Sequence, residues 1–351
     1  MDLLNTTLAN IQPVPAERLA AAYARLDSLT KPRRSLGYLE ELAARYVAIS
    51  GRERPRIGGK RICVLVGDHR VTEEGVSAYP AVVTQLMVKN FIGGGAAINV
   101  LARRAGADVE VVDLGVAEDV GPLPGLVRSN IKRGADNIAR GPAMTLDEAR
   151  RAVEVGIRLA EKAVGEGVTL LGTGEMGIGN TTPAAALLAV FLCLPAADVA
   201  GPGTGLDDAG VARKQAVLER ALAVNRARCT GALETLAALG GLEIAGLTGL
   251  CLGAAASRTA VVVDGFIAGA AALAAMRLCP AAKDYLFFAH LSAEPGHRKF
   301  FAGEGLRPVV DLGLRLGEGT GAAIAMQVIE DAVAIYNEMA TFAEVGITPG
   351  A

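Results

Sequence analysis

Three glycine-rich segments hold the side chains whose types and spacing could support chemistry. The first runs from Gly172 to Thr182, contains Glu175, and follows a short apolar stretch. A loop of this composition ahead of a helix offers free backbone N–H groups to an anion, so we interpret it as a ligand-binding loop rather than a simple tight turn. The second segment, Gly201–Asp207, is followed by Lys214. That lysine is either a phosphate partner or a solvated residue at the rim of a helix.

The third segment places Glu318 between Gly317 and Gly319, ahead of an alanine-rich stretch. Taken alone, this glutamate has the properties of a surface carboxylate favoured by a helix dipole. The alternative is a carboxylate held on a glycine-flanked loop, where a substrate can approach closely.

Several other chemistries lack their motifs. The three histidines, at 69, 290 and 297, have no short metal-ligand spacing, so no metal site is expected. Neither the phosphate-loop motif of NTPases nor the Gly-x-Ser-x-Gly motif of serine hydrolases is present. The spacing of Gly172, Gly174 and Gly177 does satisfy the dinucleotide fingerprint, although the acid required after the next strand is not evident. A dinucleotide-dependent oxidoreductase therefore remains as an alternative.

Short apolar runs alternate with alanine- and leucine-rich helical stretches along the middle of the chain. We predict buried strands at residues 61–67, 109–115, 168–172, 260–264 and 285–289. Such alternation produces right-handed βαβ units, so the predicted fold class is α/β, a parallel sheet with helices on both faces. Ligands bind such sheets beyond the carboxyl ends of the strands, where the glycine-rich segments would lie.

The two ends of the chain do not follow this alternation. Residues 16–48 have helical periodicity broken at Lys31-Pro32, and residues 327–342 are predicted to be helical. We therefore predict a small helical domain from residues 1–55 and 323–351, and a large α/β catalytic domain from residues 56–322. The apolar faces of these terminal helices could equally form a dimer interface.

Composition excludes several classes of protein. The 351 residues carry a net charge of −2, whereas binding to nucleic acid or to an anionic membrane requires a basic excess. The uncharged stretch 176–197 contains glycines and prolines, so its helical part is too short for a bilayer. Five scattered cysteines and the absence of a signal-peptide pattern predict a reduced, cytoplasmic protein.

A series of ordered motifs resembles one enzyme family over nearly the whole chain. The motifs are Lys31-Pro32, Ser35-Leu-Gly-Tyr-Leu-Glu40, Gly67-Asp-His69, Glu74-Gly-Val-Ser-Ala-Tyr-Pro80, Gly94-Gly-Ala-Ala-Ile-Asn99, Gly141-Pro-Ala-Met-Thr145, Gly174-Glu-Met-Gly-Ile-Gly-Asn-Thr-Thr182, Gly201-Pro-Gly-Thr-Gly-Leu-Asp207, His290-Leu-Ser-Ala-Glu-Pro-Gly-His297 and Arg315-Leu-Gly-Glu-Gly-Thr-Gly-Ala322. This set resembles the nicotinate-nucleotide–dimethylbenzimidazole phosphoribosyltransferases of cobalamin nucleotide-loop assembly.

The resemblance implies a reaction and an assembly. Ribose 5-phosphate would pass from nicotinate mononucleotide to 5,6-dimethylbenzimidazole or a related base, giving α-ribazole 5′-phosphate and nicotinate. The fold would be a Rossmann-like parallel sheet with a small helical domain from both chain ends, in a homodimer without a cofactor. A catalytically silent paralogue is the further alternative, and the presence of Glu318, Glu175 and Lys214 together argues against it.

The resemblance also assigns residues to roles. The catalytic base corresponds to Glu318 and a second glutamate near the ribose to Glu175. The residues expected to hold the nucleotide and its phosphate are Gly174, Gly177, Gly203, Lys214, Ser292, Arg315 and Gly317. The pocket for the base is expected at Ser77, Tyr79, Met87 and Leu316. The chain departs from the family pattern at Arg33-Arg34, Arg70 and Leu86, and the last two leave the preferred base open.

The residue types suit this reaction. Displacement at the ribose C1 passes through an oxocarbenium-like transition state, which a nearby carboxylate stabilises. Nicotinate leaves as a neutral pyridine, so a single general base suffices, and Glu318 fits that role if burial raises its pKa. No pyrophosphate leaves, so the chemistry needs no divalent metal.

Overall fold

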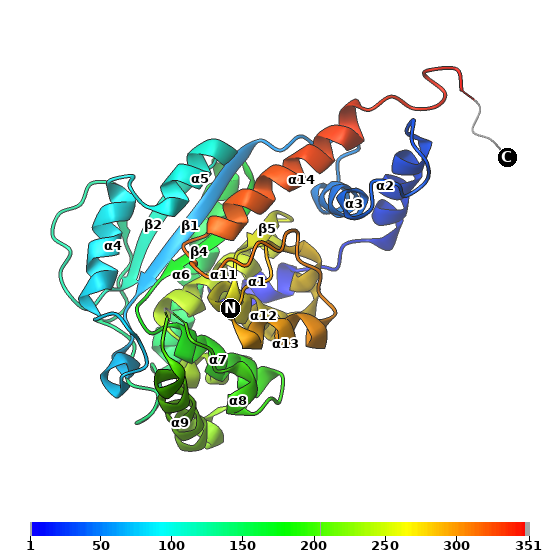
Figure 1. The fold of residues 1–351 in the computed structure, drawn as a ribbon. Helices are drawn as coiled ribbons and strands as arrows, with labels where there is room; N and C mark the ends of the chain where they lie inside the picture. The colour runs from blue at the N-terminus through cyan, green and yellow to red at the C-terminus, as the bar shows by residue number, and fades with distance from the viewer. Residues whose placement is uncertain (1, 204, 348–351) are drawn as a thin grey trace.

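A six-stranded parallel sheet forms the centre of the molecule in the computed structural model, which describes residues 2–203 and 205–347 (Figure 1). Its order is β3-β2-β1-β4-β5-β6 and every neighbouring pair is parallel. The strands are β1 (Gly59–Gly67), β2 (Asp108–Gly115), β3 (Leu126–Arg128), β4 (Val168–Met176), β5 (Ala260–Val263) and β6 (Leu286–Phe288). The predicted α/β fold class is confirmed.

Helices cover both faces of the sheet, which is why the strands are almost continuously apolar. On one face lie α4 (Val82–Ile92), α5 (Ala97–Ala105) and α14 (Thr320–Glu338), and on the other lie α6 (Leu146–Gly165), α11 (Leu242–Ala256) and α12 (Phe266–Leu278). Beyond the carboxyl edge lie α7 (Thr181–Phe191), α8 (Ala196–Val199), α9 (Asp208–Asn225), α10 (Ala232–Leu239), α13 (Pro295–Glu304) and the short 3₁₀ helices η1 (Arg70–Glu74) and η2 (Arg226–Arg228). A third 3₁₀ helix, η3 (Pro280–Tyr285), directly precedes β6 and so lies at the amino edge. Among the described residues, no helix combines the length and apolar character needed to cross a membrane.

Strand β4 differs from the prediction because it continues past Gly172 and through Gly174 to Met176 instead of ending at Gly172. Gly172 and Gly174 are therefore strand residues, and the turn that follows is short. A Cβ on Gly174 would lie 2.5 Å from the carbonyl oxygen of Glu318, so a glycine lets the Glu318 segment pack directly on the strand. The short strand β3, which has no distinctive apolar run, was not predicted.

The chain ends meet as expected, with different helix boundaries. Helices α2 (Ala16–Ser28) and α3 (Tyr38–Ser50) pack on each other, and α14 contacts α3. The segment after α14 returns to α2, where the Phe342 N–H donates to the carbonyl of Ser28 at 2.9 Å. Helix α14 spans 320–338 rather than the predicted 327–342.

Helix α1 (Leu3–Asn10) lies apart from α2 and α3, packed against α6 and α11. The division into domains at residues 55/56 and 322/323 stays a prediction, and its residues 348–351 lie outside the described part.

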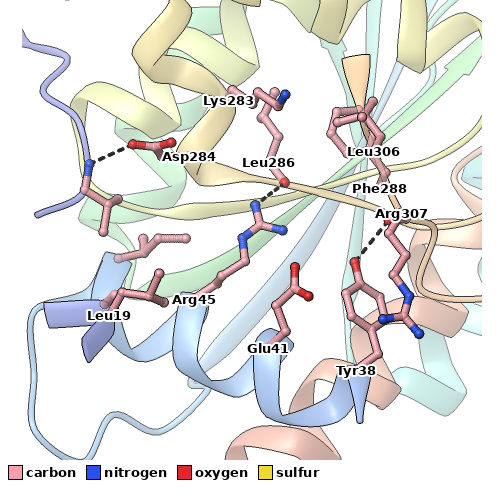
Figure 2. Close-up of a pocket in the computed structure, with 14 residues that line it drawn as sticks. Leu19, Tyr38, Glu41, Arg45, Lys283, Asp284, Leu286, Phe288, Leu306 and Arg307 are labelled. Atoms are coloured by element: carbon pink, nitrogen blue, oxygen red, sulfur yellow. Dashed lines mark hydrogen bonds between the residues drawn. The ribbon is translucent and has the colours of Figure 1, made fainter. Parts of the chain in front are cut away.

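Side-chain contacts attach α3 to the outer strand β6, around a cavity of about 320 Å³ (Figure 2). The Arg45 guanidinium donates to the carbonyl oxygen of Leu286 at 2.7 Å, and the Tyr38 hydroxyl donates to that of Arg307 at 3.0 Å. An outermost strand leaves backbone groups without a neighbouring strand, and Arg45 occupies one of them. None of the predicted site residues lines this cavity.

The sheet order reverses direction between β1 and β4. In doubly wound folds, this switch point opens a crevice beyond the carboxyl ends of the two central strands. Glu175 and Met176 end β4 at this point. The topology therefore places a ligand site where the glycine-rich segments converge.

Candidate active site

A cavity of about 340 Å³ lies at the switch point. Nine predicted site residues line it, from segments as far apart as residues 79 and 318: Tyr79, Met87, Glu175, Gly203, Ser292, Arg315, Leu316, Gly317 and Glu318. Four predicted residues are not among its lining: Ser77, Gly174, Gly177 and Lys214. The fold thus brings most of the predicted site residues together around one cavity.

Glu318 lies in a strained turn at the start of α14. The φ angles of Gly317, Glu318 and Gly319 are +87°, +65° and +94°, three successive residues in the left-handed region. Glycine adopts this region freely, whereas a side chain there costs about 1–3 kcal/mol. Such strain at a cavity wall is typical of a functional residue.

Glu318 is 6% exposed, and its carboxylate faces the N-terminus of α5. The backbone N–H of Ile98 donates to its Oε2 atom at 3.4 Å. Burial raises the pKa of Glu318 above its usual value, the Ile98 N–H opposes that rise, and the Asp264 carboxylate adds to it. A carboxylate with a raised pKa is a stronger base when ionised, as general-base catalysis requires.

Glu175 ends β4 beside this turn and is also buried. Burial, followed by the nearby carboxylates of Asp264 and Glu243, raises the pKa of Glu175 to about 8. The Asn180 side-chain amide donates a hydrogen bond to Glu175 and opposes this rise. Glu175 is therefore mostly protonated at neutral pH and can donate a hydrogen bond, whereas a carboxylate could only accept one.

Lys214 lies behind the cavity wall rather than in it. This α9 residue is 1% exposed, and its Nζ atom donates to the Thr181 hydroxyl at 2.7 Å and to the Gly201 carbonyl at 3.1 Å. A Cβ on Gly203 would lie 3.2 Å from Nζ, so the ammonium lies directly behind two lining residues, Gly203 and Thr181. Burial lowers the pKa of Lys214 to about 8, and the Glu294 carboxylate opposes this fall.

The loop before α13 supplies two more polar groups to the cavity. Glu294 accepts a hydrogen bond from the Gly203 N–H at 2.9 Å and so joins this loop to the 201–203 segment. The Ser292 N–H donates to Nδ1 of His297 at 2.8 Å. Burial, helped by His290, lowers the pKa of His297 to about 3, so this ring is neutral and accepts that bond.

Besides Lys214, three predicted residues lie outside the cavity lining. Gly174 lies within β4 against the Glu318 backbone, and Gly177 packs on the carbonyl of Gly67 and the ring of His69. Ser77 accepts a hydrogen bond from the Tyr79 N–H at 3.2 Å, next to the cavity. Because Gly172 and Gly174 are in a strand, their spacing does not form the strand-to-helix turn of a dinucleotide site, which removes the basis of the oxidoreductase alternative.

Sequence reasoning missed several lining residues: Val83, Met176, Ile178, Asn180, Thr181, Gly265, Phe266, Ile267, His290 and Glu294. A signal existed for some of them. Gly265 and Phe266 come two and three residues after the end of β5, and His290 comes soon after β6, where a parallel sheet collects its ligand-binding residues. Asn180 and Thr181 stand at the start of a helix, where polar groups commonly bind anions.

Comparison with known proteins identifies the family. A family model described as phosphoribosyltransferase matches residues 11–347. A nicotinate-nucleotide–dimethylbenzimidazole phosphoribosyltransferase of Pelodictyon phaeoclathratiforme is 56% identical over 339 residues, covering 97% of this chain and 96% of the relative. The enzyme of the same name from Geobacter metallireducens is 55% identical over 350 residues, covering 100% of this chain and 99% of the relative.

A solved structure agrees with these sequence matches. The crystal structure of CobT from Thermus thermophilus has a TM-score of 0.91 and 47% identity, covering 95% of this chain and 100% of that one. The matches extend over nearly the entire chain, including all the segments that meet at the switch-point cavity. The chain therefore belongs to the nicotinate-nucleotide–dimethylbenzimidazole phosphoribosyltransferase family of enzymes.

Proposed function

We propose that this enzyme transfers ribose 5-phosphate from nicotinate mononucleotide to 5,6-dimethylbenzimidazole or a related base, giving α-ribazole 5′-phosphate and nicotinate. The observation that carries the proposal is the pair of buried glutamates, Glu175 and Glu318, lining one cavity that a buried lysine flanks at the 201–203 segment. The ionised carboxylate of Glu318 suits the developing positive charge of the sugar, and a cation suits the phosphate of the donor.

The phosphate of the donor is proposed to lie beside Gly203 and Ser292. The Lys214 ammonium behind Gly203 and the Arg315 guanidinium on the cavity wall supply positive charge on this side. The N-terminus of α7, which begins at Thr181, adds partial positive charge. Gly174, Gly177 and Gly317 keep a proposed role by shaping the backbone around the nucleotide.

The acceptor base is proposed to lie among Tyr79, Met87 and Leu316, with Ser77 beside them. Tyr79 and Leu316 are 53% and 58% exposed, so they form a rim that a flat aromatic base could cover. Leu86, which departs from the family pattern, is 53% exposed in the same helix as Met87.

The proposed mechanism is an in-line displacement at C1 of the ribose. A lone-pair nitrogen of the acceptor attacks C1 opposite the nicotinate, so the configuration inverts from β to α. The bond from C1 to nicotinate breaks, and its electron pair returns to the pyridine nitrogen. The acceptor's other nitrogen loses its proton to Glu318, while protonated Glu175 is placed to donate a hydrogen bond near the ribose.

The proposal includes a cytoplasmic homodimer. Exposed apolar side chains gather along α4 and near the cavity mouth at Tyr79, Val82, Leu86 and Leu316, and a second subunit would cover apolar surface of this kind. Light scattering with sedimentation measurements would give the molecular mass in solution. A particle of the monomer's mass across the working concentration range would contradict this part.

Turnover with a panel of acceptor bases tests the function. Purified enzyme is mixed with nicotinate mononucleotide and each base, and the products are identified by mass spectrometry and by the configuration at C1. We expect the α-ribotide of a benzimidazole together with free nicotinate. Absence of turnover with every base would favour the catalytically silent alternative, and a β product would contradict inversion.

A further inference from the structure

Asp264 ties three parts of the site together from outside the cavity. It directly follows strand β5, is 2% exposed, and is not among the residues that line the cavity. Its Oδ2 atom accepts a hydrogen bond from the Gly319 N–H at 3.1 Å, and its Oδ1 atom accepts one from Ala322 at 3.0 Å. Its own N–H donates to the Thr173 hydroxyl on β4 at 2.9 Å.

Besides its packing on β4, the turn that carries Glu318 has few other hydrogen bonds within the described part of the chain. Thr320 contacts Gly317 through its N–H at 3.1 Å and its hydroxyl at 2.8 Å, but both bonds lie within the turn itself. From elsewhere in the chain, Ile98 contributes only the long 3.4 Å bond to the carboxylate. A left-handed backbone at a non-glycine residue persists only where surrounding groups hold it. The Asp264 carboxylate is the buried group placed to do so.

We propose that Asp264 is a positioning residue for the general base: it fixes the Gly317–Gly319 turn and so aims the Glu318 carboxylate into the cavity. This inference rests on the proposed function, in which Glu318 is the base. The competing explanation is that Asp264 only caps the N-terminus of α14 and stabilises the fold. The two explanations predict different kinetics.

A double-mutant cycle separates them. Steady-state kcat and KM are measured for the parent, Asp264→Ala, Glu318→Gln and the double variant. We expect Asp264→Ala to lower kcat by at least about tenfold with little change in KM for nicotinate mononucleotide. In the double variant, we expect no loss beyond that of Glu318→Gln alone, because a residue that acts through Glu318 has nothing left to position.

Asp113 provides a matched control. It too is a buried carboxylate near the end of a strand, β2, and it accepts hydrogen bonds from the Val116 N–H at 2.8 Å and the Asn130 amide at 3.1 Å. It does not line the cavity. We expect Asp113→Ala to lower stability while leaving kcat within about twofold of the parent.

A second, more conservative variant keeps the test possible if Asp264→Ala does not fold. Asp264→Asn keeps one acceptor oxygen, so it is expected to fold and to lose part of kcat; the cycle is run with it if Asp264→Ala does not fold. Hydrogen exchange is expected to speed up in the peptide that spans the Gly317–Gly319 turn in the Asp264 variants, and not in Asp113→Ala.

The outcomes distinguish the inference from the proposed function. Nearly normal kcat in Glu318→Gln would remove the base assignment itself. If Glu318→Gln is inactive as expected, unchanged kcat in the Asp264 variants, or losses that multiply in the double variant, would overturn only the positioning role.

Discussion

The Lys214 ammonium lies 2.7 Å from the Thr181 hydroxyl, and this bond joins the start of α7 to α9 behind the cavity wall. The same ammonium holds the carbonyl of Gly201 at 3.1 Å. Lys214 is therefore placed to shape the 201–203 segment as well as to supply charge toward a phosphate. Both effects act equally on the ground state and the transition state, because the phosphate does not react.

Replacing Lys214 is expected to weaken nucleotide binding without much change in the chemical step. A charge-assisted hydrogen bond contributes about 1.5–3 kcal/mol, so KM for nicotinate mononucleotide in Lys214→Ala should rise about 10- to 100-fold. Initial-rate kinetics measure this. Arg213→Ala is the control, because Arg213 is an exposed neighbour on the same helix and contacts the Gly75 carbonyl instead. An unchanged KM in Lys214→Ala would exclude the phosphate role.

The pKa of Lys214 leads to a second prediction. Burial lowers this pKa to about 8, so the amine is charged at pH 7 and becomes neutral as the pH rises past 8. We expect KM for the nucleotide to increase between pH 7 and pH 9, since the neutral amine no longer attracts the phosphate. The Lys214→Ala enzyme should lose this part of the pH dependence, and an identical KM profile in both enzymes would assign it to another group.

Glu318→Gln is expected to lower kcat by at least about a hundredfold with nucleotide affinity nearly preserved. Glutamine keeps the shape but removes the base, whose contribution is typically about 10²- to 10⁴-fold, and also the charge facing the oxocarbenium ion. Single-turnover rates and nucleotide binding are measured on the same preparation. Nearly normal kcat in a folded variant would contradict the assignment and make Glu175 the next candidate.

The left-handed backbone at Glu318 predicts a difference in stability between two inactive variants. Alanine retains the strain of a Cβ at φ +65°, whereas glycine does not. Glu318→Gly should therefore be more stable than Glu318→Ala by about 0.5–1 kcal/mol, after the larger unfolded-state entropy of glycine is included. Denaturant unfolding of both variants measures this, and the reverse order would show that the turn relaxes in solution.

Chelator treatment is expected to leave activity unchanged. The pyridinium nitrogen of the donor leaves as a neutral pyridine nitrogen and the donor has only a monophosphate, so the reaction creates no pyrophosphate charge for a divalent cation to neutralise. Rates are compared before and after incubation with EDTA and dialysis. Loss of activity that one added divalent ion restores would refute the prediction.

The parallel sheet could be predicted because its strands are apolar on both faces and therefore stand out as continuous runs. The end of β4 could not, because Gly172 and Gly174 are poor strand formers whose presence is explained by close neighbours from β1, the distant Glu318 segment and α14. Strand β3 has three residues, which is too short to show a pattern. At both places, tertiary packing outweighs the local conformational preference of the residues.

The glycines around Glu318 and the resemblance to a known family were enough to predict most of the cavity lining. The position of Lys214 relative to the cavity could not be predicted from the sequence, because it depends on how α9 packs behind the 201–203 segment. Asp264 was predicted only as the end of a strand, although a carboxylate at that position of a parallel sheet was a reason to assign it to the site.

The pairing of Ser28 with Phe342 has a consequence for synthesis on the ribosome. Helices α2 and α3 emerge from the ribosome long before α14, which packs on α3. Contacts between segments so distant in sequence form late during folding. Until α14 is synthesised, the apolar surface of α3 that it covers stays exposed. Because the Glu318 turn directly precedes α14, a nascent chain becomes competent for catalysis only when these two distant segments have joined.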